Sequence, residues 1–366
     1  MLIGLPPLRL NLRFCDFCRT GEALCGVRVI IAGDIGGTKC NLAAFREAGR
    51  ELRLLTRQRY ATGEHSSFEA ILQSFCATIR SELRDSGLDP IRAMGLGVPG
   101  TVVDGRLYAL NLPWAVERAS LASVLHLHLK NVLLLNDLVA TAFSLDKLSA
   151  DDFFPLNQGI GDPHGNKAVI AAGTGLGEAV LYWDGRRHRA APSEGGSADF
   201  APRDEREVRL LLFLKQHLSR VSCEDIFSGR GFRKLHEFLD PRVIHSTFAE
   251  RESTSASEIT QNAFEKTCPV CVQVLNWWID AFGAEAGNLA LRVLAYGGVF
   301  LAGGIAIKIL PMLKVSSFCR SFASKGPMTK ILSRIPISVI LNEDAPLLGA
   351  AHRALAVVGS TSGDFL

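Results

Sequence analysis

Three glycine-rich segments carry much of the chemistry that this sequence offers, and each follows an apolar stretch of strand length. The first, Gly33–Lys39, presents consecutive backbone N–H groups, with the carboxylate of Asp34 before them and a hydroxyl and an amine after them. Such a concave turn holds phosphate oxygens, and Asp34 could hold Mg²⁺ through water. The segment is not a Walker A loop, because the GxxxxGK[ST] spacing is missing.

Two further glycine turns, Gly173–Gly177 and Gly303-Gly304, occupy the same position after a strand. A single glycine hairpin is usually only a turn, but three of them in equivalent places favour phosphate binding. The segment Gly95–Gly100 also matches the pattern GxGxxG. The residues after it are β-branched and lead to another turn and not to a helix, so a dinucleotide site is not indicated.

The pair Asn136-Asp137 ends a strongly apolar strand, which is where open sheets place their ligand crevices. Asp137 could take the proton from an attacking hydroxyl as a general base. It could equally cap the following helix, and from the pair alone the cap is the commoner use. Glu194 and Glu224 stand in small or apolar surroundings and could accept hydrogen bonds from sugar hydroxyls, although solvated surface glutamates are the commoner case.

Composition excludes several classes of protein. Hydrophobic residues make up 48% and charged residues 21% of the 366 residues, and the formal net charge is +3. These values are ordinary for a globular protein, without the basic footprint of a nucleic-acid binder or an apolar run of membrane-spanning length. We therefore expect no nucleic-acid or membrane partner.

The cysteines indicate a reducing compartment. There are nine, an odd number, and no secretory signal is apparent, so we expect a cytoplasmic protein with reduced thiols. Two CxxC pairs occur, Cys15–Cys18 and Cys268–Cys271. A zinc site needs two further ligands, and no adjacent His or Cys supplies them, so inert thiols are favoured over zinc.

Hydrophobic periodicity places these segments in two α/β halves. Strands are predicted at 27–32, 41–45, 93–98, 132–135, 168–172, 179–183, 299–302 and 335–341, and helices at 68–84, 121–129, 138–145, 208–218, 271–294 and 347–358. Each half begins with a strand, a glycine turn and a strand, a weak duplication that predicts a cleft between two domains. We expect a disordered extension at 1–26, a small α/β domain at 27–147 plus 342–360, and a large α/β domain at 148–341.

Taken together, these segments resemble the bacterial glucokinase family of the hexokinase/actin-like ATPase superfamily. The resemblance runs from about Val27 to about Ala356, and the order and spacing of its motifs are hard to obtain by chance. The motifs are GDIGGTK (33–39), LNDLVATA (135–142), AGTGLG (172–177), EGGSADFAPR (194–203), VSCEDIFSG (221–229), GNLAL (287–291) and GGVFLAGGI (297–305).

The resemblance implies a two-domain actin-like ATPase (ribonuclease H-like) fold and phosphorylation of the 6-hydroxyl of glucose by ATP with Mg²⁺. It implies Asp137 as the catalytic base. The residues implied to contact glucose are Asn111, Asn136, Asp137, Glu194, Glu224 and, in place of a family histidine, Ser197. Those implied to contact ATP are Asp34 (with Mg²⁺ through water), Gly36, Gly37, Thr38, Lys39, Gly173, Thr174, Gly175, Gly303 and Gly304. A homodimer is also implied.

One position departs from the family pattern, which reads Glu-Gly-Gly-His where this chain has Ser197. Serine can donate and accept a hydrogen bond but is shorter and uncharged. This keeps open a kinase for another hexose, such as mannose or an amino sugar. A sugar-sensing protein without catalysis is a further alternative, although no helix-turn-helix pattern precedes the first strand. The cysteine-rich zinc motif of ROK proteins is absent from 198–222.

Overall fold

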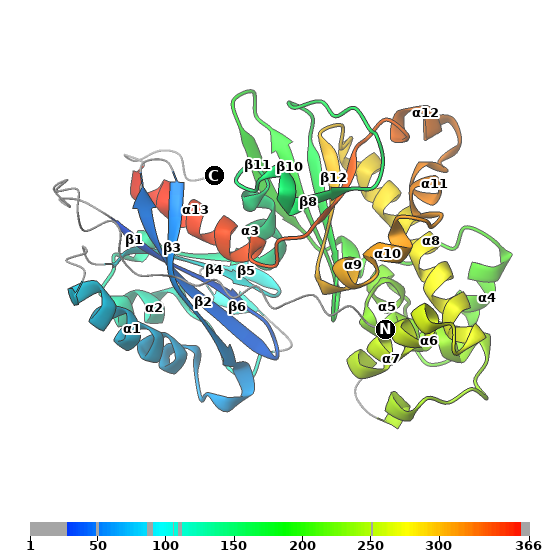
Figure 1. Ribbon diagram of the computed structural model, residues 1–366, viewed down its shortest axis with the longest axis horizontal. Helices are drawn as coiled ribbons and strands as arrows, with labels where there is room; N and C mark the ends of the chain where they lie inside the picture. The colour runs from blue at the N-terminus through cyan, green and yellow to red at the C-terminus, as the bar shows by residue number, and fades with distance from the viewer. Residues whose placement is uncertain are drawn as a thin grey trace, which may run out of the picture.

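The computed structural model describes residues 28–48, 51–85, 91–104, 106–108, 112–249 and 252–359. The predicted extension at 1–26 lies outside the described residues. The chain forms two lobes, each built on one mixed sheet, and they lie side by side in Figure 1.

The first lobe contains a five-stranded sheet in the order β3-β2-β1-β4-β7. Its strands are β1 (Val29–Ile35), β2 (Lys39–Ala48), β3 (Glu51–Ala61), β4 (Ile91–Val98) and β7 (Val132–Asn136), and a separate ribbon contains β5 (Thr101–Val103) and β6 (Arg106–Tyr108). Strands β1, β4 and β7 run parallel, so their carboxyl ends meet at one edge of the sheet.

Helices cover both faces of this sheet. They are α1 (Phe68–Asp85), α2 (Arg118–Leu125), α3 (Asp137–Ser144) and α13 (Ala345–Gly359). Side chains of β1 alternate between two cores: Val29 and Ile31 pack with α1 and α2, whereas Ile30 and Ala32 pack with α13. Figure 1 shows the red helix α13 on the face opposite α1 and α2, so the last helix of the described residues packs on the lobe that contains their first strand.

The second lobe contains a six-stranded sheet in the order β11-β10-β9-β12-β13-β8. Its strands are β8 (Phe153–Pro155), β9 (Lys167–Ala172), β10 (Leu176–Trp183), β11 (His188–Ser193), β12 (Gly298–Ala302) and β13 (Ile337–Ile340). Five of the positions repeat the first sheet: an antiparallel meander, then two parallel strands. The predicted duplication is therefore visible in the topology.

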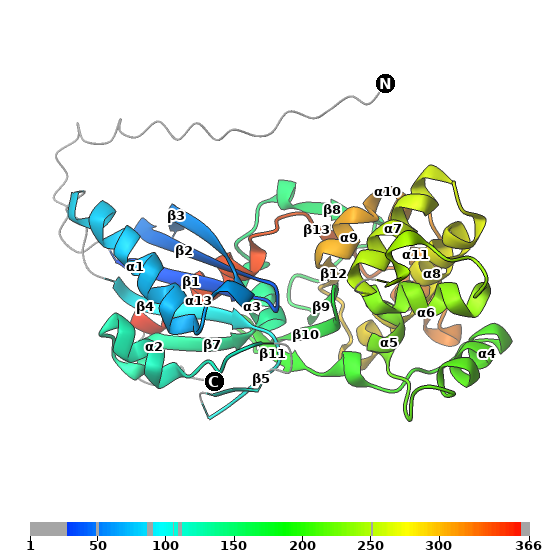
Figure 2. The same cartoon turned by 90° about the horizontal axis from the view of Figure 1, so that it is seen from below.

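A group of helices covers one face of the second sheet (Figure 2). They are α4 (Glu205–Leu214), α5 (Cys223–Phe227), α6 (Gly229–Leu239), α7 (Glu252–Glu265), α8 (Pro269–Val293), α9 (Gly304–Lys308), α10 (Leu310–Leu313), α11 (Phe318–Ala323) and α12 (Thr329–Leu332). Short 3₁₀ turns are η2 (Thr62–Glu64), η3 (Leu129–Asn131), η4 (Ala150–Asp152), η5 (Gly195–Ser197), η6 (Ser246–Ala249) and η7 (Gly326–Met328). Buried Trp278 on α8 stacks on Phe232 of α6, which joins these helices into one core.

Helix α3 belongs to both lobes. Its Ala140 packs into the core under α13, while Leu138 and Val139 pack against Val169 and Ala179 of the second sheet. At the α3–α13 crossing, a Cβ on Gly349 would lie 1.7 Å from the Ala140 carbonyl oxygen, so only glycine permits this approach. The first residue of α3 is thus held where the lobes meet.

The predicted bounds of one helix and of one strand need correction. The helix expected at 121–129 is α2, which begins at Arg118 and ends at Leu125, because His126 adopts a left-handed conformation (φ 55°) that stops it. The last strand, expected at 335–341, is limited to Ile337–Ile340. Among the described residues, no helix combines the length and the hydrophobicity that spanning a membrane requires.

Candidate active site

The first glycine turn connects β1 to β2 and is closed by its own backbone. The Gly36 N–H donates to the Lys39 carbonyl at 2.8 Å, and the paired register of β1 and β2 ends there. Buried Thr62, in η2, supports the turn: its hydroxyl donates to the Gly36 carbonyl at 2.8 Å, and its N–H donates to the Thr38 carbonyl at 3.1 Å. Gly37, Thr38 and Lys39 are exposed, so the turn can meet a ligand.

Asp34 precedes this turn and lies directly opposite Asn41 in the β1–β2 pairing. The Asn41 amide donates to the Asp34 carboxylate at 3.4 Å, and Asn41 in turn accepts from Arg59 at 3.0 Å. Burial raises the pKa of Asp34, while the Asn41 bond and the nearby Lys39 charge oppose the rise. Sequence reasoning did not single out Asn41, although the register of a hairpin centred on 37–38 would have identified it.

The second and third glycine turns lie side by side because β9 and β12 are parallel neighbours. Ala302, at the end of β12, pairs with Ala171, near the end of β9. Gly303 adopts φ +86°, and a Cβ there would lie 2.6 Å from the Ala172 carbonyl oxygen, so glycine is required. Thr174, Gly303 and Gly304 are exposed, which leaves their backbone accessible at this edge of the sheet.

The structure separates the two roles that the sequence left open for Asn136-Asp137. Asn136 is the N-cap of α3: its side-chain oxygen accepts from the N–H groups of Leu138 and Val139, at 3.0 and 3.2 Å. Its amide donates to the Gly100 carbonyl at 3.2 Å, which leaves one amide hydrogen for a ligand. The cap is therefore made by Asn136, and Asp137 is the first residue of the helix.

The Asp137 carboxylate is held by local backbone N–H groups. Its Oδ1 accepts from the Leu138 N–H at 2.9 Å. The pKa of Asp137 is raised to about 6, first by burial and then by the charges of Asp34 and Glu194, while the Leu138 N–H opposes the rise. The structure thus brings three predicted acidic residues into electrostatic contact, and Asp137 becomes a stronger base than an ordinary carboxylate.

Glu194 is the N-cap of the short turn η5, after β11, and Ser197 is the last residue of that turn. Both are exposed, and the Ser197 N–H donates to the Glu194 carbonyl at 2.9 Å. Arg220 donates to the Ser197 carbonyl at 2.5 Å. The position at which the family pattern has histidine therefore faces solvent in this conformation, next to the carboxylate that acts on Asp137.

Glu224, in α5, is bound to the second glycine turn. Its Oε2 accepts from the Leu176 N–H at 3.0 Å, and its Oε1 pairs with Arg230 at 2.5 Å. The Gly229 N–H, at the start of α6, donates to the Gly173 carbonyl at 2.8 Å. In this conformation the Glu224 carboxylate supports the second glycine turn. Arg230 was not identified from the sequence.

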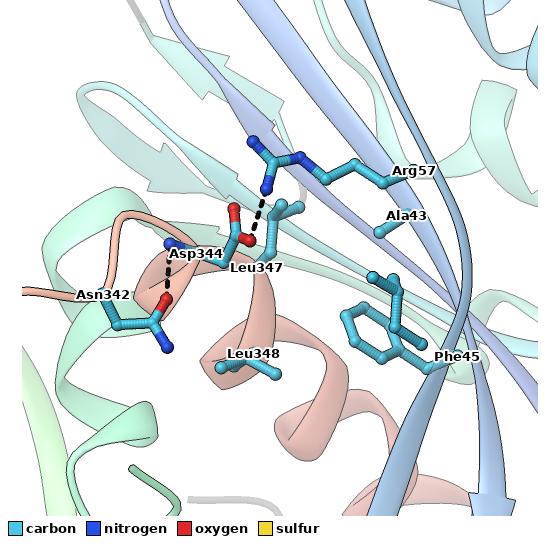
Figure 3. A pocket seen from close by; sticks show the side chains of 8 residues that line it. Ala43, Phe45, Arg57, Asn342, Asp344, Leu347 and Leu348 are labelled. Atoms are coloured by element: carbon cyan, nitrogen blue, oxygen red, sulfur yellow. Dashed lines mark hydrogen bonds and ion pairs between the residues drawn. The ribbon is translucent and has the colours of Figure 1, made fainter. Parts of the chain in front are cut away.

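A pocket of about 100 Å³ lies between β2–β3 and the segment that leads into α13, as Figure 3 shows. Arg57 and Asp344 form an ion pair across it. The charge of Asp344 raises the pKa of Asp34 and the charge of Arg57 lowers it, so the residues of this pocket influence a carboxylate of the site. Asn111, predicted from the sequence to bind sugar, lies outside the described residues.

A family model described as Glucokinase matches residues 31–357. A glucokinase of Nostoc sp. is 36% identical over 344 residues, which cover 88% of this chain and 98% of the relative. A glucokinase of Synechocystis sp. is 34% identical over 352 residues, covering 88% of this chain and 96% of that protein.

Solved structures show the same arrangement. The crystal structure of a glucokinase from an Antarctic psychrotroph superposes with a TM-score of 0.75 at 26% identity, covering 90% of this chain and 99% of that one. A ROK family glucokinase from Streptomyces griseus, in complex with glucose and AMPPNP, superposes with a TM-score of 0.59 at 23% identity, covering 90% of this chain and all (100%) of that one. The second likeness is one of fold.

Proposed function

The chain belongs to the glucokinase family, and we propose that Asp137 is the general base of its reaction. It is an ATP-dependent sugar kinase that phosphorylates glucose, with the two-domain actin-like ATPase fold that the sequence predicts. One observation carries the proposal: Asn136 caps α3, so Asp137 is not needed as the cap, and burial raises its pKa to about 6.

The proton transfer follows from this geometry. Oδ1 of Asp137 is held by the Leu138 N–H, which orients the carboxylate and leaves Oδ2 to accept the proton of the sugar 6-hydroxyl. At neutral pH a carboxylate with a pKa near 6 is mostly ionised, yet it is more basic than an ordinary aspartate. General-base help of this kind contributes about 10²–10⁴-fold.

The three glycine turns supply the phosphate contacts in this proposal. The N–H groups of Gly36 and Gly173 close their own turns on the carbonyls of Lys39 and Gly175, so those at 37–39 and 174–175 would face the β- and γ-phosphates. Gly303-Gly304 would border the adenosine. Exposed backbone at the carboxyl ends of β1, β9 and β12 supports this assignment. Pre-positioned N–H groups stabilise the charge that develops during transfer without reorganising, which is where phosphoryl-transfer enzymes gain most.

Asp34 fits a role toward Mg²⁺. Mg²⁺ is usually bound by one or two carboxylates together with phosphates and water. Asp34 is one half-buried carboxylate beside the first turn, and its burial-raised pKa indicates a charge in need of compensation. Bound Mg²⁺ would neutralise charge on the phosphates. Asp34 and its partner Asn41 would orient the hydrated ion.

The remaining polar residues would surround the sugar. Asn136 offers its one remaining amide hydrogen, Glu194 offers a carboxylate next to Asp137, and Glu224 joins them by leaving the second turn. We place Asn111 in the same set from the sequence resemblance. Because Glu224 now supports the phosphate turn, binding of sugar and of ATP would be coupled through it.

Ser197 is the reason to keep a second hexose in view. Its hydroxyl cannot reach as far as the imidazole that the family pattern has there, so one sugar hydroxyl would meet water instead. Buried hydrogen bonds to hydroxyls are what let a site reject epimers. A raised KM for glucose, or a relaxed preference that admits mannose, is the expected consequence.

We also propose that residues 27–147 with 342–360 close against residues 148–341 when sugar binds, which excludes water from the phosphate. The chain passes from the second lobe back to the first near Asn342, whose side-chain amide donates to the Asp152 carboxylate at 2.9 Å. Small-angle scattering with and without glucose tests closure, and an unchanged radius of gyration would count against it.

We propose that the enzyme is a cytoplasmic homodimer that uses Mg²⁺–ATP. Light scattering measures the mass of the particle and so tests the dimer.

The deciding experiment is a coupled assay of Mg²⁺–ATP with glucose, mannose, fructose, galactose and N-acetylated amino sugars. Glucose is expected to have the highest kcat/KM, and Asp137→Asn to remove turnover while sugar still binds. Full activity in that variant would refute the proposed base. A better substrate other than glucose would instead show that Ser197 marks an altered pocket.

A further inference from the structure

Four potential metal ligands converge in the helical layer of the second lobe, away from the glycine turns. His236 lies in the last turn of α6, His245 lies between α6 and η6, Cys268 is the N-cap of α8, and Cys271 is in its first turn. One ligand atom from each of the four lies within 4.8 Å of every other. Neither cysteine forms a disulfide.

His236 has no explanation as an ordinary core residue. Its side chain is 0% exposed, and neither Nδ1 nor Nε2 has a hydrogen-bond partner. Buried polar groups are almost always paired, because an unpaired one keeps its desolvation cost. The ring packs edge-on against His245 and Phe248, each at 5.0 Å between centroids, and one of its nitrogens lies within 4.8 Å of the other three ligand atoms.

The cysteines are equally enclosed. Cys271 is 0% and Cys268 8% exposed, and the Cys271 sulfur lies 3.2 Å from Nε2 of His245. Neutral imidazole and cysteine sulfur in one buried pocket form a soft donor set.

We propose that His236, His245, Cys268 and Cys271 bind one structural Zn²⁺. Zinc takes four such ligands in a tetrahedron with Zn–S near 2.3 Å and Zn–N near 2.0 Å, which places the donor atoms roughly 3.3–3.8 Å apart. The longest separation here is 4.8 Å, so rotations of the four side chains would complete the tetrahedron without moving a helix far. All four positions are protein ligands, as in a closed structural site.

The surroundings contain a group that orients one ligand. Asn262, on α7, lies 3.4 Å from Nδ1 of His245, on the side of the ring opposite the sulfur. When Nε2 binds a metal, neutral His245 carries its proton on Nδ1. If the Asn262 side-chain amide is flipped, its oxygen accepts a hydrogen bond from that Nδ1–H. Such second contacts fix the tautomer of ligating histidines. His245 is partly exposed, which gives the ion a route into the site.

The sequence favoured inert thiols because no His or Cys adjoins the Cys268–Cys271 pair. The structure supplies the missing pair from α6 and the loop after it, more than twenty residues earlier in the chain. The ion would fasten the end of α6 to the start of α8. Because α6 begins at Gly229 and carries Arg230, this attachment supports the residues that hold Glu224 and the second glycine turn.

Metal content tests the proposal directly. The full chain, purified without a tag or chelator from zinc-supplemented cells, is expected to hold about one zinc per chain by plasma mass spectrometry. Cys271→Ser and His236→Gln are each expected to lower this to less than about a fifth. The matched controls are Cys319→Ser, a half-buried thiol elsewhere in the lobe, and exposed His217→Gln, both of which should retain the metal.

A second measurement needs no variant. Wild-type protein stripped by chelation is titrated with Co²⁺, and the intense visible bands of a tetrahedral thiolate site are expected to saturate at about one equivalent. Removing zinc should lower Tm by at least about 5 °C, because the ion fastens α6 to α8. Absence of zinc together with absence of Co²⁺ bands would overturn the proposal. So would metal retained in both ligand variants, or a thiol count showing a Cys268–Cys271 disulfide.

Discussion

Replacing Asp137 by asparagine should remove activity and at the same time stabilise the protein at alkaline pH. Asparagine has the same shape, and its side-chain oxygen can still accept the Leu138 N–H, so α3 should begin as before. What disappears is the ability to take a proton and the cost of a buried charge. The expected loss of kcat is about 10²–10⁴-fold.

The size of the stabilisation follows from the pKa. The folded-state pKa of about 6 lies above the ordinary value of 3.8, so the folded protein binds the proton more tightly than the unfolded chain does. Stability is therefore lost as pH rises through the window from about 4 to about 6. A difference of about two pKa units corresponds to about 3 kcal/mol above pH 7, and to about half of that near pH 5.

The assay is urea unfolding of ligand-free protein at pH 8 and pH 5, beside steady-state kinetics. Asp137→Asn should exceed the wild type by about 3 kcal/mol at pH 8 and by about 1.5 kcal/mol at pH 5. Exposed Asp151→Asn is the matched control and should change neither quantity. In the wild type, kcat/KM for glucose should fall tenfold per pH unit below about 6, since the base must be ionised.

Two results would refute this reasoning separately. Wild-type turnover in Asp137→Asn would remove the residue from the chemistry. An inactive variant with no added stability at pH 8 would keep the base but show that its charge is well solvated, against the burial that the structure displays.

Three further predictions concern the sugar, the nucleotide and the joint between lobes. Ser197→His should lower the KM for glucose and raise the glucose-to-mannose ratio of kcat/KM; an unchanged ratio would show that the position does not read the sugar. Gly303→Ala should raise the KM for ATP at least about tenfold and leave the KM for glucose unchanged, because a Cβ would lie 2.6 Å from the Ala172 oxygen. Gly349→Ala should cost about 2–4 kcal/mol in urea unfolding by forcing α13 off α3. In the control Gly63→Ala the new Cβ meets no heavy atom within 4 Å, and a change within about 0.5 kcal/mol is expected; an equal loss in both would contradict the packing argument.

The strands that carry the site could be predicted because they are buried and apolar. Strands β1, β4, β7, β9 and β12 were all found near their observed positions, and the first glycine turn was correctly interpreted as a hairpin. The edge strand β3 was missed. Its exposed residues alternate irregularly, and its pairing with β2 shifts register between Ala44 and Phe45, so no clean period of two survives in the sequence.

The ambiguity at Asn136-Asp137 shows where local sequence stops being informative. Both side chains are good N-caps, and the outcome depends on the residue at which the strand ends. Strand β7 continues through Asn136, pairing it with Val98, so Asn136 lies one residue before the helix and takes the cap. That pairing is set by β4, nearly forty residues earlier, and no window around position 137 contains it.

The groups that hold the site in place were the least predictable, for a related physical reason. Most of the residues that we propose as ligand contacts lie at or directly after the ends of strands, so the strand pattern indicates their positions. Their supports come from helices inserted later in the chain: Arg230 of α6 pairs with Glu224 of α5, and ligand atoms of His236 and Cys271, on α6 and α8, lie within 4.8 Å of each other. Such contacts have no period and no fixed spacing. In such a chain the sequence therefore indicates the proposed functional residues at the ends of strands. The contacts that hold those residues rigidly can be identified only from the packing of the helices.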